Sequence, residues 1–145
     1  MDASHPPAQL LGTASLFKLE TLFIDAGLDP TAALDERSLS APWRQHTLRW
    51  LAQAAPAVAL AVHNAACLLD LECAIVDGSF SRPLQATLLS HVKDALDLHS
   101  WEGVACPQLL PGTIGSDARA IGGALLPLYA HFAPDRELFL KLSAG

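Results

Sequence analysis

Apolar residues recur at helical spacing near the start of the chain. A stripe of leucine and phenylalanine predicts a helix over residues 15–26, after an irregular lead-in over residues 1–14. Gly27 stands where a left-handed helix end favours glycine. Asp29 and Pro30 then predict the capped start of a second, short helix, because proline is well tolerated at the first helical position.

A long uncharged segment follows. Residues 42–69 predict a helix that is apolar on several sides and is kinked or broken at Pro56. Residues 51–69 carry no charge and approach the length of a membrane span. They also contain Gln53 and Asn64 and are built from alanine more than leucine. We therefore expect a buried core helix and no membrane contact.

Two short apolar runs flank an amphipathic segment. Residues 73–76 are followed by Asp77-Gly78 and are typical of a central strand covered on both faces. Residues 82–98 predict a helix, and residues 104–110 a second strand in which Pro107 favours an edge or a bulge. Strand, helix and strand in this order imply a right-handed parallel crossover. The pattern thus predicts a helix-rich α/β fold with a small parallel sheet.

The last part of the chain combines a turn with helical signals. Residues 111–115 predict the turn, and Ser116 caps a helix over residues 117–129. A pair of glycines at 122 and 123 costs about 1 kcal/mol each relative to alanine, so we expect close packing there. Pro134 precedes a last short helix, which we expect over residues 135–142. The length of 145 residues fits a single domain over residues 1–145.

Charge and cysteine content narrow the functional classes. A net charge of −6 repels phosphate backbones, so we expect no direct nucleic-acid binding. Three cysteines in apolar surroundings indicate reduced, buried thiols and a cytoplasmic protein. His63 and Cys67 are spaced as two ligands on one helix face, but we expect no metal site. The N-terminus has no signal-peptide pattern.

Several of these segments together resemble a known family. They are Asn64 with Leu69-Asp70, then Ala74-Ile75-Val76-Asp77-Gly78, and finally Gly115-Ser116-Asp117-Ala118 with Gly122-Gly123-Ala124. Their order and spacing resemble the C-terminal part of the ROK family of sugar kinases and sugar-responsive transcriptional repressors. The resemblance covers residues 46–131 and implies part of an actin/hexokinase-like, ribonuclease H-like lobe. The family often has two glycines after the strand, where this chain has Asp77-Gly78.

The resemblance also implies what lies elsewhere. The phosphate loop, the catalytic aspartate, the sugar-contacting residues and a structural zinc motif of the family have no counterpart in this chain. We therefore expect a truncated lobe with no catalytic or metal-binding residues and no cofactor of its own. A parent protein would supply the N-terminal lobe, the sugar site and the zinc, and would bind ATP and magnesium only as a kinase. A homo-oligomer is expected, because an isolated lobe exposes apolar surface.

The candidate ligand site lies at the ends of the two predicted strands. Asp77, Gly78 and Ser79 follow the first strand, and Gly115 and Ser116 follow the second. Ligands bind at this edge of open α/β sheets, and the resemblance places it on the nucleotide side of a cleft. The alternative is a plain turn in which Gly78 supplies a positive φ. An aspartate here opposes a nucleotide phosphate, which favours a repressor lobe over a sugar-kinase lobe. A stand-alone dimerisation module is a third alternative.

Overall fold

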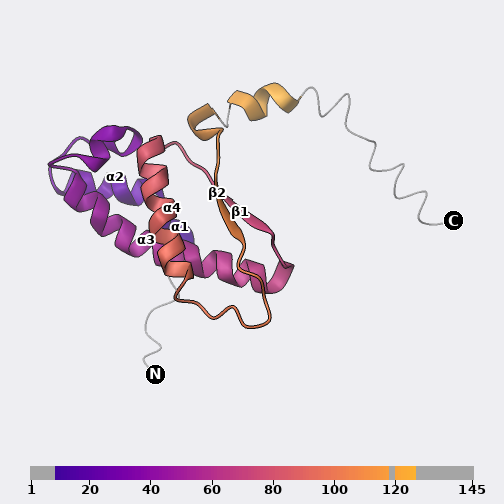
Figure 1. Cartoon of the computed structure of the whole chain (residues 1–145). Coiled ribbons are helices and arrows are strands. Elements are labelled where there is room, and N and C mark those ends of the chain that lie inside the picture. Colours follow the sequence, from indigo (N-terminus) through magenta and orange to yellow (C-terminus); the bar gives the residue numbers. More distant parts are fainter. Residues whose placement is uncertain (1–8, 118–119, 127–145) are drawn as a thin grey trace. The chain divides into compact units, whose positions relative to one another are not determined.

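The computed structural model describes residues 9–117 and 120–126. The chain divides into two compact units, Met1–Gly115 and Ser116–Gly145. The first unit is helix-rich and contains a two-stranded parallel sheet (Figure 1). The helix-rich α/β class is therefore confirmed.

Two short α-helices begin the described chain. Helix α1 spans Leu10–Ala14, within the residues for which we expected an irregular lead-in, so that part of the expectation is wrong. Helix α2 spans Leu16–Asp25 and is capped by Ser15, whose side chain accepts a hydrogen bond from the Lys18 amide. Helix α1 was not predicted because five residues are too few to show helical periodicity and because Pro6 and Pro7 precede it.

Two 3₁₀ helices connect α2 to the longest helix. They are η1, Pro30–Leu34, and η2, Glu36–Leu39. Arg37 joins them, because its guanidinium lies 2.8 Å from both Asp29 Oδ2 and Asp35 Oδ2. A hydrogen bond from the Thr31 hydroxyl, together with those from Arg37, lowers the pKa of Asp29 to about 2. The expected short helix after Asp29 is confirmed, in 3₁₀ form.

Helix α3 spans Arg44–Leu69 and continues through Pro56, so of the two expected effects of this proline, a kink or a break, the break is wrong. Proline removes one backbone donor from the helix. Pro56 lies on the exposed side of α3, where water can bond to the carbonyl four residues earlier that loses its backbone donor. By length and composition α3 alone among the described helices is apolar enough to cross a membrane. Seven of its residues, including Trp50, Leu51 and Ala59, are nevertheless buried within the fold.

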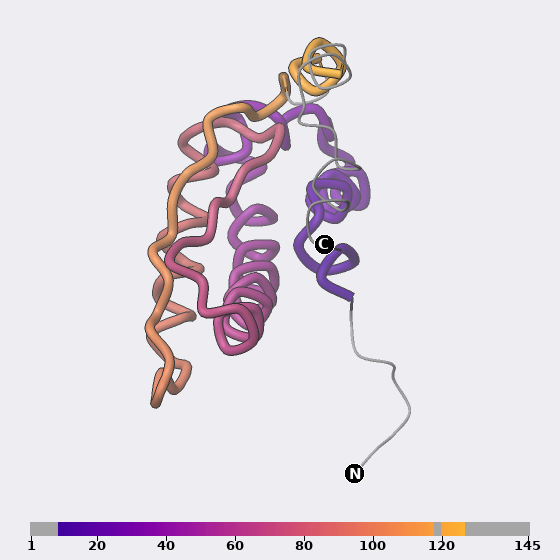
Figure 2. The backbone as a smooth tube through the Cα atoms, turned by 90° about the vertical axis from the view of Figure 1, so that its right-hand side faces the viewer, coloured from indigo at the N-terminus to yellow at the C-terminus, as the bar shows by residue number. Residues whose placement is uncertain are grey.

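The sheet forms between two segments that are distant in sequence. Strand β1, Cys73–Val76, pairs in parallel with strand β2, Gln108–Pro111, and Cys73 lies beside Gln108. Helix α4, Arg82–Leu96, makes the crossover between them. Figure 2 shows the two strands running side by side, with α3 and α4 along one side of the pair. The parallel crossover is confirmed, but β2 begins four residues later than expected.

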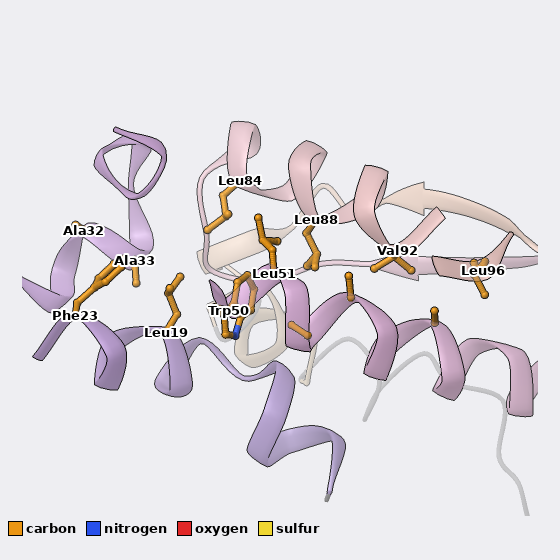
Figure 3. Packing of buried hydrophobic residues seen from close by; sticks show 13 residues of the cluster. Leu19, Phe23, Ala32, Ala33, Trp50, Leu51, Leu84, Leu88, Val92 and Leu96 are labelled. Carbon is orange, nitrogen blue, oxygen red and sulfur yellow. The ribbon is translucent and has the colours of Figure 1, made fainter. Parts of the chain in front are cut away.

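The core lies between α3 and α4. Helix α4 contributes one side chain per turn to it, and Figure 3 shows them on the side of α4 that faces α3, with Leu84 and Leu88 near Leu51; they are Leu84, Leu88, Val92 and Leu96. Val76 and Leu109 from the two strands pack against the same cluster. Each fully buried leucine or valine contributes about 1.5–3 kcal/mol. The apolar stripe read from the sequence of α4 therefore does face the core.

The opposite face of the sheet is open. Cys73 and Ile75 alternate with the core-facing residues of β1, and Ile75 is 67% exposed. We expected a strand covered on both faces, which is wrong for the described residues. All four residues of β1 are apolar, so the sequence does not show which face of the strand is covered by the rest of the chain and which is exposed.

The second unit is described over a short stretch. The 3₁₀ helix η3 spans Gly115–Asp117, and residues 120–126 are α-helical. A Cβ at Gly122 or Gly123 would meet no atom within 4 Å among the residues of this unit that the structure describes. The helix expected over residues 135–142 lies outside the described residues.

Candidate functional site

The carboxylate of Asp77 joins the turn after β1 to the turn after β2. Its Oδ2 accepts hydrogen bonds from the backbone amides of Ile114 and Gly115, each at 3.0 Å. Its Oδ1 accepts a third, from the Gly78 amide at 2.9 Å. Both strands run in the same direction, so their carboxyl ends meet at one edge of the sheet. One side chain can therefore bridge the two turns.

Arg82 adds a positive charge to the same turn. Its Nη1 lies 3.6 Å from Asp77 Oδ1, and its guanidinium also donates to the carbonyls of Gly112 at 2.6 Å and Thr113 at 2.9 Å. Arg82 is the first residue of α4, where the helix dipole disfavours a cation. The carbonyl oxygens and the Asp77 carboxylate offset that penalty.

Gln85, one turn further along α4, is a buried polar residue in an otherwise apolar face. Its Nε2 donates to the carbonyls of Val76 at 2.8 Å and Gly112 at 3.0 Å. Its Oε1 accepts from Arg82 Nη1 at 2.8 Å. Every polar group of the side chain thus has a partner, as a buried amide requires. Gln85 fastens α4 to the ends of both strands.

The electrostatics of the turn keep Asp77 ionised. The amide hydrogen bond from Gly115, those from Gly78 and Ile114, and the charge of Arg82 lower the pKa of Asp77 against the opposing effect of desolvation. Its side chain is 26% exposed. A carboxylate that accepts several amide hydrogen bonds is stabilised in its charged form. The turn therefore carries a negative charge, and the amide donors around it already bind the Asp77 carboxylate.

Glycine at position 112 makes room for this carboxylate. A Cβ added to Gly112 would overlap the Asp77 side chain and lie 2.6 Å from its Oδ2. Gly115 has a φ of +60°, which favours glycine. Gly78 does not have a positive φ, so that detail of the plain-turn alternative is wrong. A Cβ there would instead lie 2.6 Å from the ring of Phe80.

The predicted site residues are only partly brought together. Asp77, Gly78 and Gly115 meet in the hydrogen-bonded turn. Ser79 and Ser116 are exposed, and their hydroxyls bond to no residue that the structure describes. Ser116 belongs to the second unit, Ser116–Gly145.

Sequence reasoning missed Arg82, Gln85 and Gly112. Two of them carry a detectable signal. Arg82 is a cation at a helix start, and Gln85 is a polar residue on the same face as Leu88 and Val92. Both features are unfavourable unless tertiary partners compensate for them. Gly112 carries no comparable signal, because turns are commonly rich in glycine.

The thiols and histidines form no metal centre in the described part of the chain. Cys67 Sγ lies 3.8 Å from His63 Nε2, but no group of three or more candidate ligands is positioned around an ion there. The donor set does not fit the structural zinc that the resemblance implies for a parent protein. All three cysteines are free and exposed, so the expectation of buried thiols is wrong. Apolar neighbours in sequence did not translate into burial.

Surface hollows lie on other elements. One of about 560 Å³ is lined by α1 and α2 with residues such as Leu11 and Phe17, and one of about 270 Å³ by Lys93 and Leu109 among others. None of the residues that line them is Asp77 or one of its hydrogen-bond partners. The features that distinguish the strand-end turn are therefore the amide donors around Asp77 and the charge of its carboxylate, and not a surface hollow.

Compared with known proteins, the chain matches no protein-family model and no curated sequence.

Proposed function

We propose that the chain is the C-terminal lobe of a ROK-type transcriptional repressor, acting in sugar sensing and oligomerisation and not catalytic by itself. In this proposal the sheet belongs to an actin/hexokinase-like lobe of a cytoplasmic protein. An N-terminal lobe completes the sugar cleft, and a separate module of the parent binds DNA. The order α3, β1, α4, β2 is the order that the resemblance implies, which supports the proposal.

The observation that carries the proposal is the placement of the Asp77 carboxylate. Ligands of open α/β sheets bind beyond the carboxyl ends of the strands, where this turn lies. A nucleotide phosphate there would meet an ionised carboxylate and compete with it for the amides of Ile114 and Gly115. Like charges in one site repel, so nucleotide binding is disfavoured. A sugar-responsive repressor does not require ATP, whereas a sugar kinase does.

The open face of the sheet supports a lobe that is covered in a larger assembly. Parallel strands are ordinarily covered on both faces, yet Ile75 and Cys73 are exposed on β1. Two strands also make a marginal sheet. Further strands from a parent protein, or a second subunit, would cover this apolar surface. The exposed surface thus favours association as part of the function.

The proposal is tested on the intact parent protein with its own promoter DNA. Fluorescence anisotropy is measured while a panel of monosaccharides is titrated into the complex. We expect at least one sugar to change the DNA affinity by about tenfold, corresponding to a coupling energy of about 1.4 kcal/mol. No change with any sugar in the panel would contradict the sensor function.

Two alternatives give different results in parallel measurements. A sugar-kinase lobe predicts that the parent phosphorylates a hexose with ATP, which a coupled ADP assay detects. A stand-alone dimerisation module predicts that the 145-residue chain is a stable dimer by light scattering, with no sugar response. The charge at Asp77 opposes the first alternative, whereas the open face of β1 is compatible with the second.

A further inference from the structure

The turn around Asp77 has the chemistry of an occupied oxyanion site. Three backbone amides, from Gly78, Ile114 and Gly115, point at the two oxygens of one carboxylate. The guanidinium of Arg82 lies beside the same carboxylate and is 52% exposed. Converging amides and a guanidinium are the donors that proteins use to bind carboxylates and phosphates. Here the bound anion is a side chain of the chain itself.

The space that the carboxylate fills is bounded by Gly112. The three atoms nearest to a Cβ built on Gly112 all belong to Asp77. The Gly112 backbone is itself held in place, because its amide donates to the Val76 carbonyl at 2.8 Å and its carbonyl accepts from Arg82 and Gln85. The contacts of this wall with Val76 and Gln85 do not involve Asp77.

We propose that Asp77 is the intramolecular occupant of an oxyanion site and closes that site to free anions. When the side chain is removed, as in Asp77→Gly, the amides and Arg82 take up a small carboxylate such as formate. The assignment deepens the proposed function and rests on it for its biological meaning, since it identifies the group that excludes anionic ligands from this edge. The contacts themselves do not depend on the family of the protein.

The shape of the donor set favours a planar carboxylate. Two amides share Oδ2, while Oδ1 receives the third amide and faces Arg82. Formate presents two oxygens with the same separation as the aspartate side chain and is small enough to replace it. Sulfate has the same charge-based attraction, but its tetrahedral shape matches the emptied space less well.

The test is chemical rescue of the full 145-residue chain. The melting temperature of Asp77→Gly is measured by circular dichroism at pH 7, in sodium formate and in sodium chloride at equal ionic strength. We expect a saturable gain of about 3–6 °C in formate over chloride, as for a ligand that binds only the folded state. If the variant is unfolded in chloride, formate should restore its native spectrum.

Matched variants separate site binding from a general salt effect. In Asp77→Gly/Gly112→Ala, the added methyl group lies where the carboxylate stood, so formate should give no gain. The chain with Asp77 intact should also give none, and neither should Gln85→Met, which is destabilised but keeps its internal anion. Amide resonances of Gly78, Ile114 and Gly115 should shift with formate in Asp77→Gly alone.

The proposal is overturned if formate stabilises Asp77→Gly no more than chloride does. It is equally overturned if the double variant or Gln85→Met gains as much as Asp77→Gly. Neither result involves promoter DNA or sugar, so failure here is distinguishable from failure of the repressor function. Conversely, a sugar-insensitive parent leaves the rescue experiment unaffected.

Discussion

Gln85 is the residue whose removal best tests how the sheet end is held. Its side chain is 2% exposed and joins β1, Gly112 directly after β2, and Arg82 through three hydrogen bonds. Gln85→Met keeps the length and the helix propensity of the side chain but removes all three bonds. The change therefore isolates the polar contribution from the packing contribution.

The magnitude follows from the partners. A bond to a neutral carbonyl contributes about 1 kcal/mol, and one to a charged group about 1.5–3 kcal/mol. The partners are not left bare, because the Val76 carbonyl keeps the Gly112 amide and Arg82 keeps two carbonyls. The apolar methionine also offsets part of the loss. We therefore expect the free energy of unfolding to fall by about 2–3 kcal/mol.

Urea denaturation followed by far-UV circular dichroism measures this change. Gln53→Met is the matched control, because Gln53 is exposed on α3 and bonds to no residue that the structure describes. The control should change the stability by less than about 0.5 kcal/mol. A loss below about 0.5 kcal/mol for Gln85→Met, comparable to the control, would refute the role of Gln85 in fastening the strands.

Three further measurements address the core, the charge and the thiols. Leu84→Ala should lose about 2–5 kcal/mol in the same urea assay, whereas Leu98→Ala, at an 87% exposed position, should lose little. The folded-state pKa of Asp77 lies below its ordinary value of about 3.9, so its contribution is present above that pH and is lost as the pH falls through the folded pKa. The stability difference between the chain and Asp77→Asn should therefore be largest at neutral pH and shrink as the pH falls through the folded pKa, and a pH-independent difference would count against an ionised bridge. A thiol reagent should label every cysteine of the native chain, as mass spectrometry can count, and protection of any of them would contradict the exposure of Cys67, Cys73 and Cys106.

Asp77 shows how one residue changes the interpretation of a strand-end turn. By itself, an aspartate after a strand indicates a surface turn or the edge of a ligand site. Its contacts with Ile114 and Gly115 make it part of the structure, because it supplies the anion that those amides would otherwise take from solvent or ligand. The same contacts explain why Gly112 must lack a side chain. The same hydrogen bonds of Asp77 thus join the two turns and, in our proposal, exclude an anionic ligand from them.

The sequence alone was sufficient for the elements whose signals are local. Helices α2 and α4 follow from the periodicity of their apolar residues, and strand β1 from a short apolar run. The parallel pairing followed from element order and the handedness of crossovers. These features depend on interactions within a few residues, which a sequence displays directly.

Tertiary structure decided the rest. Asp77 accepts hydrogen bonds from amides that lie 37 and 38 residues away in the sequence, and no local sequence pattern predicts hydrogen bonds over that separation. The thiols and the outer face of β1 are exposed although their neighbours in sequence are apolar, because burial depends on what packs against a surface. The sequence thus pointed to Asp77, Gly78 and Gly115 of the turn but not to Arg82, Gln85 or Gly112, and the hydrogen bonds that occupy the amide donors are a property of the folded chain.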